Sequence, residues 1–184
     1  MVQPTPSYVS YEDFLEAELR SPTKHEWLDG VVYAMAGGTL EHSRLAVNVT
    51  AALKIAFPTC TVFQSDAMIL VRATGLSTYA DGVIVCGAID TQKVERSRRV
   101  IGEALINPTV IVEVLSNSTE TYDRSEKFAH YMRIPSLREY ILVSQDARRI
   151  EVFRRPKHGR WDVDEVTAGD IRVLDARIRV EDVY

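Results

Sequence analysis

The sequence of 184 residues contains no apolar run that approaches the roughly 20 residues of a membrane-spanning helix. Its start, Met1 to Ser10, is mostly polar and lacks the apolar core of a signal peptide. It also lacks internal repeats, low-complexity stretches and linkers. We therefore expect a cytoplasmic protein that folds as one domain, residues 1–184.

Cysteine is scarce: the chain has only Cys60 and Cys86, each in or beside an apolar run typical of a strand. No histidine or further cysteine clusters with them, which argues against a zinc site. Free cysteines are commonly buried as small apolar side chains. We therefore predict that both cysteines are core residues and not a redox pair.

Positive charge is also in short supply, because 22 Lys and Arg face 26 Asp and Glu, for a net charge of −4. A protein that coats nucleic acid without specificity depends on clustered Lys and Arg, so this class is disfavoured. A local basic groove remains compatible with the composition. The densest basic cluster is Lys93, Arg96, Arg98 and Arg99, which we take as candidate nucleic-acid contacts, with an exposed charged loop as the alternative.

The hydrophobic share of 46% with 26% charged residues is typical of a globular domain. Hydrophobic periodicity and turn residues predict an α/β or α+β fold with an N-terminal helix and a β-hairpin. The expected helices are 10–21, 39–57 and 123–134. The expected strands are 25–28 and 31–35 in one hairpin, 60–71 and 79–86 in a second, then 110–115, 139–143, 150–153 and an edge strand within 159–166. We expect residues 87–107 to be an irregular connection and the tail to alternate between apolar and polar residues.

The most informative strand is Val110 to Leu115, in which every residue except Glu113 is apolar. Such a strand is buried on both faces, and an unpaired buried carboxylate costs several kcal/mol. A basic partner, a metal ion or an open cleft resolves this cost. Asp81 heads a second apolar run, so the two acids can share one Mg²⁺ if their strands are neighbours.

Lys127 follows the Glu113 strand on a predicted helix that Asp123 caps. Because Asp123 and Lys127 are four residues apart, their side chains share one helix face. Lys127 would then orient an attacking water or stabilise the charge of a transition state. The alternative is a structural ion pair of Asp81 or Glu113 with Lys127 or Arg72.

Several motifs together resemble the putative restriction endonuclease domain family of the PD-(D/E)XK nuclease superfamily. They are HEWLDGVVYAM at 25–35, His42, ADGVIV at 80–85, PTVIVEVLS at 108–116, DRSEK at 123–127 and EYILV at 139–143. The resemblance implies a mixed β-sheet flanked by helices. It further implies a Mg²⁺ or Mn²⁺ ion held by Asp81, Glu113 and the Val114 carbonyl, and endonuclease activity on nucleic acid. We expect the nucleic acid to be DNA, with RNA as the alternative.

Two positions depart from the superfamily pattern: Ala80 replaces the proline before the first acid, and Leu115 replaces the catalytic lysine after the second. The resemblance implies that Lys127, from the following helix, supplies that lysine. It also suggests accessory roles for Glu26, His42 and Asp123 near the cleft. Glu26 could equally be an exposed hairpin residue, and His42 only a polar helix start.

Two other functions remain open on the sequence alone. The first is a catalytically silent module that binds nucleic acid or protein on a nuclease scaffold, because a fold does not fix its activity. The second is a structural partner protein that associates through a sheet edge. We also expect a homodimer, because hairpin edges and an apolar tail need cover.

Overall fold

Strand β9 (Val110–Leu115) is buried along its whole length, as its sequence predicts, and it organises the fold. It belongs to a six-stranded mixed sheet with the order β12-β11-β10-β9-β6-β3. β9 runs parallel to β10 and antiparallel to β6, so both of its edges are paired. The partner strands are β3 (Thr61–Gln64), β6 (Gly82–Val85), β10 (Glu139–Ser144), β11 (Ile150–Arg154) and β12 (Asp162–Val166).

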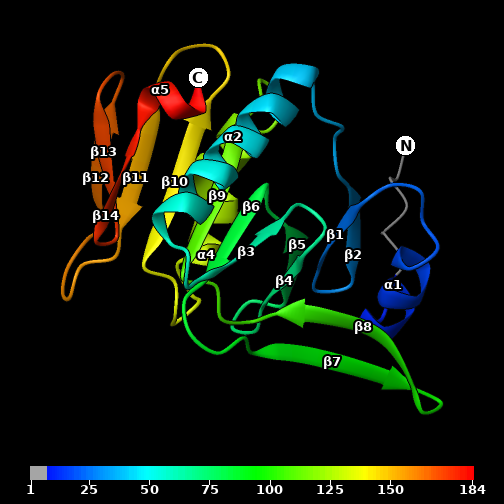
Figure 1. Ribbon diagram of the computed structural model, residues 1–184. Coiled ribbons are helices and arrows are strands. Elements are labelled where there is room, and N and C mark those ends of the chain that lie inside the picture. Colours follow the sequence, from blue (N-terminus) through cyan, green and yellow to red (C-terminus); the bar gives the residue numbers. More distant parts are fainter. Residues whose placement is uncertain (1–7) are drawn as a thin grey trace.

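A second six-stranded mixed sheet has the order β2-β1-β5-β4-β8-β7. Its strands are β1 (His25–Leu28), β2 (Val31–Ala34), β4 (Met68–Val71), β5 (Leu76–Tyr79), β7 (Thr91–Arg96) and β8 (Arg99–Leu105). One hydrophobic cluster contains Ile69 and Leu76 of this sheet together with Val83 and Ile111 of the other. The structure, a computed structural model, describes residues 8–184 (Figure 1). It confirms the predicted mixed α/β fold.

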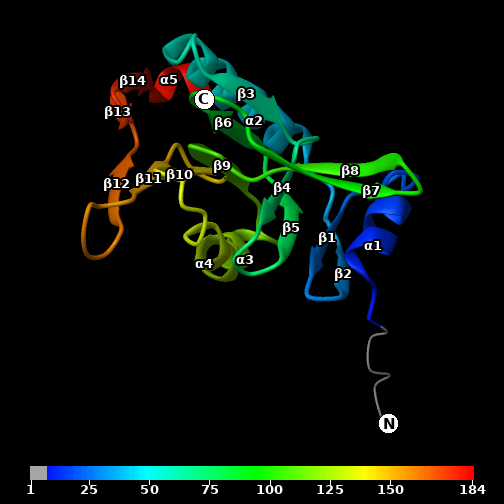
Figure 2. The same cartoon turned by 90° about the horizontal axis from the view of Figure 1, so that it is seen from below.

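Helices cover the two faces of the β9 sheet, which explains where Glu113 points. Helix α2 (Leu40–Ala56) packs on Val110, Val112 and Val114. Alternate residues of β9 face the other way, where α4 (Phe128–Tyr131) contributes to the cluster around Ile111 and Leu115 (Figure 2). Glu113 has the parity of Ile111 and Leu115, so its carboxylate lies on the α4 side.

Three predicted elements at the N-terminal end are confirmed. Helix α1 (Tyr11–Glu18) begins after Ser10, whose side chain accepts the Asp13 N–H at 3.1 Å. β1 and β2 form the expected hairpin, and the turn residues Asp29 and Gly30 have positive φ angles of 45° and 89°. α2 begins after the capping residue Thr39.

Two predictions for residues 60–107 are wrong in detail. The expected second hairpin is divided between the sheets, because β4 pairs with β5 in one sheet while β3 pairs with β6 in the other. The expected irregular connection is the hairpin of β7 and β8. Its turn residues Ser97 and Arg98 have positive φ angles of 52° and 65° without glycine or asparagine, so the usual turn signal is absent.

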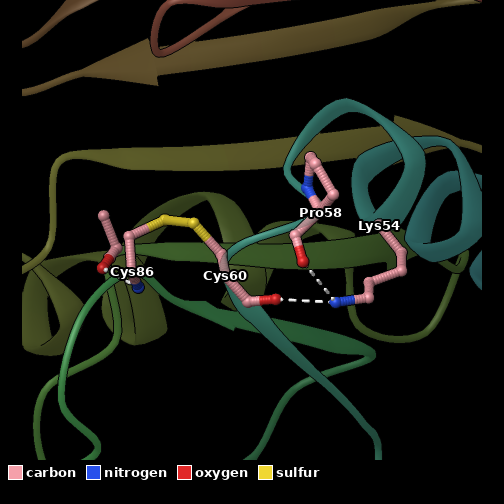
Figure 3. The surroundings of a disulfide bond; sticks show 5 residues. Lys54, Pro58, Cys60 and Cys86 are labelled. Carbon is pink, nitrogen blue, oxygen red and sulfur yellow. Dashed lines mark hydrogen bonds between the residues drawn. A yellow bond between two sulfur atoms is a disulfide. The ribbon is translucent and has the colours of Figure 1, made fainter.

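The cysteine prediction holds only for the burial of Cys60, which lies in the core. It is wrong for Cys86, which is exposed, and for the pairing, because Cys60 and Cys86 form a disulfide (Figure 3). Cys60 directly precedes β3 and Cys86 directly follows β6. The register pairs Thr61 with Val85, so the two cysteines lie opposite each other, with their Cα atoms 4.4 Å apart. Lys54 of α2 donates hydrogen bonds to the carbonyls of Pro58 and Cys60, which ties the helix end to the same site.

The apolar tail is covered by the chain itself. β13 (Asp170–Val173), β14 (Ala176–Arg179) and α5 (Val180–Val183) bury Ile171, Val173 and Ile178 in the cluster under α2. The tail therefore gives no argument for a homodimer, which rests on the sheet edges alone. No helix within residues 8–184 is both long and apolar enough to cross a membrane.

Gly82 permits the close approach of α2 beside Asp81. A Cβ atom at this position would lie 2.6 Å from Thr50 Cγ2 and 3.4 Å from Val112 Cβ. We expect Gly82→Ala to lower the free energy of unfolding by about 1–3 kcal/mol, because the helix must shift. Urea denaturation measures the loss.

Gly37→Ala is the matched control, since a Cβ there meets nothing within 4 Å. It should change stability by less than about 0.5 kcal/mol. Equal stability of Gly82→Ala and the control would show that α2 is not held close to β6.

Candidate active site

Asp81 and Glu113 come together at one pocket, as their sequence contexts suggest. β6 and β9 are neighbours, and the pairing of Gly82 with Val112 places Asp81 opposite Glu113. Both acids line a pocket of about 510 Å³ between the β1–β2 hairpin and the segment that follows β9. The pair therefore faces one cavity rather than opposite faces of the sheet.

Lys127 lies at the base of this pocket with its side chain 5% exposed. Its Nζ atom is 3.0 Å from Glu113 Oε1, 3.3 Å from Glu26 Oε1 and 3.7 Å from Asp123 Oδ1. It also donates a hydrogen bond of 3.1 Å to the Tyr79 carbonyl. One ammonium group is thus shared by three carboxylates.

The helical segment that carries Lys127 begins earlier than predicted. α3 (Glu120–Tyr122) follows Thr119, and Asp123 lies inside the segment, not at its cap. The turn η1 (Asp123–Lys127) has π-helical geometry and continues into α4. The shared face of Asp123 and Lys127 is nevertheless present, and both side chains are buried at the pocket. π-helical turns are frequent at functional sites.

The carboxylate of Asp81 is held through one of its oxygen atoms. Oδ2 accepts the Val114 N–H at 2.8 Å and lies 3.1 Å from His42 Nε2. No donor for Oδ1 is found among residues 8–184. His42 comes from the first turn of α2, so this helix positions the ring over the acid.

Glu113 shows the same arrangement. Its Oε1 atom receives the Lys127 ammonium and the hydroxyl of Tyr131, each at 3.0 Å. Oε2 has no donor in the part of the chain that the structure describes. Each acid therefore has one oxygen atom fixed by donors and one without a donor among residues 8–184, and both residues line the pocket.

Glu26 is buried, not an exposed hairpin residue. Its Oε2 atom accepts the Tyr122 hydroxyl at 2.8 Å, and Oε1 accepts the Thr78 hydroxyl and contacts Lys127. Because these partners come from β5 and the Lys127 helical segment, Glu26 joins the two sides of the pocket.

The buried charges perturb one another. Burial raises the pKa of Glu113 well above its ordinary value; the Lys127 ammonium opposes this, and Asp123 and Asp81 add to it. Burial also raises the pKa of Asp123, against the effect of Lys127. For Lys127 burial acts to lower the pKa, but Glu113, Glu26 and Asp123 together raise it, so the ammonium stays charged. The hydrogen bond to Asp81 raises the pKa of His42, although burial opposes it.

The site is suited to a cation but does not hold a ready set of side-chain ligands. Among residues 8–184, no group of three or more His, Cys, Asp and Glu side chains is arranged to hold a metal ion. Asp81 and Glu113, each with one carboxylate oxygen that has no donor among residues 8–184, line a pocket that Val114 also lines. Hard oxygen ligands in small number suit Mg²⁺, which keeps several waters. The residues present therefore fit such an ion.

The predicted basic cluster lies elsewhere. Lys93 and Arg96 are in β7, where Arg96 pairs with Asp13 and Glu16 of α1 and Lys93 lies 3.6 Å from Glu103. Arg98 and Arg99 follow at the hairpin turn, and none of the four basic residues lines the pocket. Arg96 therefore has a structural role, and the hairpin is separate from the acids.

Sequence reasoning missed Tyr131, Tyr122 and Thr78, whose hydroxyls bind the pocket acids. Tyr131 had a usable signal, because it follows Lys127 by four residues and so shares its helix face. Thr78 and Tyr122 had no such signal in the sequence, because their hydrogen bonds to Glu26 join segments that are far apart in the chain.

The raised pKa of Glu113 predicts a pH dependence of stability in protein freed of metal. A carboxyl whose folded pKa exceeds its unfolded value of about 4.3 stabilises the fold fully below that pH. This contribution is lost as the pH rises through the folded pKa. Glu113→Gln removes the loss, so the variant should gain stability relative to wild type as the pH rises from about 5 to about 8. Urea unfolding in EDTA measures the difference.

Glu126→Gln, which removes an exposed carboxylate from the same helical segment, is the control. A pH-dependent gain that is found in Glu113→Gln and absent from this control would be due to the burial of Glu113. A large loss of stability in Glu113→Gln at neutral pH would instead show that the pair with Lys127 is a net stabilising ion pair.

The chain is similar to known proteins in sequence and in fold. Residues 11–179 match the model of the family Uma2, described as putative restriction endonuclease. Uncharacterized protein slr1290 of Synechocystis is 32% identical over 88% of this chain and 82% of its own length. Uncharacterized protein sll1609 of the same organism is 28% identical over 90% of this chain and 92% of its own length.

The fold is also similar to a crystal structure from Anabaena variabilis, described as a putative nuclease belonging to DUF820. The two structures superpose with a TM-score of 0.68 over 92% of this chain and 96% of that one, at 15% identity. At this identity the likeness concerns the fold alone. The family match extends over nearly all of the chain, including both acids and Lys127, and the chain belongs to the Uma2 family.

Proposed function

We propose that this protein is a metal-dependent endonuclease that hydrolyses phosphodiester bonds of nucleic acid. The observation that carries the proposal is the pair Asp81 and Glu113, each with one fixed and one free oxygen at the same pocket, above a buried lysine. The family description agrees with this class of activity.

Asp81, Glu113 and the Val114 carbonyl would hold Mg²⁺ or Mn²⁺. The bound ion supplies a Lewis acid for the phosphoryl oxygens and lowers the pKa of a water molecule. Hydrogen bonds to Oδ2 of Asp81 and Oε1 of Glu113 orient the two acids before any ligand enters. This preorganisation reduces the reorganisation required during the reaction.

Lys127 would stabilise the negative charge that develops on the phosphoryl group. Its buried ammonium is held by Glu26 and the Tyr79 carbonyl, so it remains charged and fixed at the pocket. A fixed cation in a poorly solvated site acts more strongly than one in water. His42, beside Asp81, is placed to hold or pass a proton.

The proposed substrate is nucleic acid, and we expect DNA. The exposed turn at Arg98 and Arg99 offers a modest electrostatic contact outside the pocket. A homodimer formed through a sheet edge remains a prediction, as does the cytoplasmic location.

A calorimetric titration with Mn²⁺ tests the metal site directly. We expect wild type to bind Mn²⁺, and Asp81→Asn and Glu113→Gln to lose binding while they stay folded, because each change removes a charged ligand. Cleavage of labelled DNA and RNA should require the metal and be lost in both variants. No binding by wild type at millimolar Mn²⁺ would overturn the proposal.

Replacement of Lys127 separates its role from that of the acids. Lys127→Met should bind Mn²⁺ as tightly as wild type or more tightly, because the carboxylates lose a competing cation. Its cleavage rate should fall by at least about 100-fold, because a charge that acts on the transition state affects turnover more than binding. Lys157→Met, an exposed substitution after β11, is the control and should cleave normally.

One observation favours the second candidate, a catalytically silent binding module. The ion pair between Lys127 and Glu113, at 3.0 Å, could hold the scaffold without chemistry. Nucleic-acid binding without cleavage, with full affinity in Glu113→Gln and no response to Mn²⁺, would support that function over the nuclease.

A further inference from the structure

The hydroxyl of Tyr131 is placed on the same carboxylate oxygen as the Lys127 ammonium. Tyr131 is 0% exposed, and its hydroxyl donates to Glu113 Oε1 at 3.0 Å. Lys127 approaches this oxygen from one helical turn earlier, also at 3.0 Å. The helix thus directs two donors at Oε1 and none at Oε2.

The aromatic ring of Tyr131 makes its apolar packing contacts without help from the hydroxyl group. The side chain lies in an apolar cluster with Leu115 and Phe128, and its ring centroid is 5.6 Å from that of Tyr140. A phenylalanine would fill the same space. A buried hydroxyl needs a partner, and for Tyr131 the one found within residues 8–184 is Glu113.

Lys127 alone does not fix the orientation of the Glu113 carboxylate. Its ammonium is shared with Glu26, Asp123 and the Tyr79 carbonyl. A lysine ammonium acts as a compact point charge, and rotation about the last bond of a glutamate side chain is broad. The directed hydrogen bond from Tyr131 is therefore what distinguishes Oε1 from Oε2.

We propose that Tyr131 is a positioning residue that locks Oε1 of Glu113 inward and so presents Oε2 to a divalent cation in the pocket. This inference rests on the proposed function, since it assigns a supporting residue to the same metal site. Tyr131 does not line the pocket itself. It acts through the carboxylate.

Calorimetric titration of Tyr131→Phe with Mn²⁺ at one fixed pH tests this role. We expect the Mn²⁺ dissociation constant to rise by about 10–100-fold, the usual effect of losing a hydrogen bond to a metal ligand. Tyr140→Phe is the matched control, because Tyr140 is equally buried and its hydroxyl donates at 3.0 Å to the Asp123 carbonyl, not to a pocket acid. Melting temperatures of the two variants should fall by similar amounts, while only Tyr131→Phe loses Mn²⁺ affinity.

The outcomes separate this inference from the proposed function. If wild type binds Mn²⁺ and Tyr131→Phe binds it equally well, the positioning role is overturned while the nuclease proposal stands. If Tyr140→Phe weakens Mn²⁺ binding as much as Tyr131→Phe, the effect is general loosening and the role is again overturned. If wild type binds no Mn²⁺, the metal site and the role assigned to Tyr131 both fail.

Discussion

The burial of a carboxylate in the middle of β9 constrains the rest of the site. Glu113 lies in a strand that is covered on both faces, and it is paired with Leu142 of β10, whereas the pairing with β6 ends at Val112. Its buried side-chain oxygens therefore need partners from outside the strand. The charge requires donors on the α4 side of the sheet, and the helical segment after β9 supplies them. The helical segment lies where Lys127 and Tyr131 can both donate to the Glu113 carboxylate.

The π-helical turn η1 carries Lys127, whose ammonium is one of the donors to Glu113. Asp123, Lys127 and Tyr131 follow one another at intervals of four residues. Asp123 and Lys127 line the pocket, and the Tyr131 hydroxyl binds the pocket acid Glu113. The wider turn between Asp123 and Lys127 interrupts the regular helix there. The Asp123 carbonyl in this turn accepts the Tyr140 hydroxyl, so this buried carbonyl has a donor. A helix that begins at Asp123, as the sequence suggested, would leave that carbonyl in a different setting.

Local signals predicted much of the fold, whereas contacts between distant segments were beyond them. The apolar run around Glu113, the Asp29–Gly30 turn and the Thr39 cap are each encoded by adjacent residues, and each is present. Pairing of Cys60 with Cys86 depends on the register of β3 with β6, which neither strand specifies alone. That disulfide also contrasts with the expected cytoplasmic location, since disulfides persist mainly in oxidising compartments.

The number of acidic and basic side chains at the pocket favours a cation site over a purely structural ion pair. A structural pair needs one basic group for each acid, but Glu26, Asp81, Glu113 and Asp123 share one lysine and one histidine. Even with His42 protonated, the four acids exceed the basic groups by two charges when all are ionised. Protons can neutralise this excess, as the raised pKa values of Glu113 and Asp123 indicate, or a divalent cation can. In the proposed function, the donor-free oxygens of Asp81 and Glu113 would supply ligands to such a cation, so the charge excess that makes the cluster unfavourable by itself would favour metal binding.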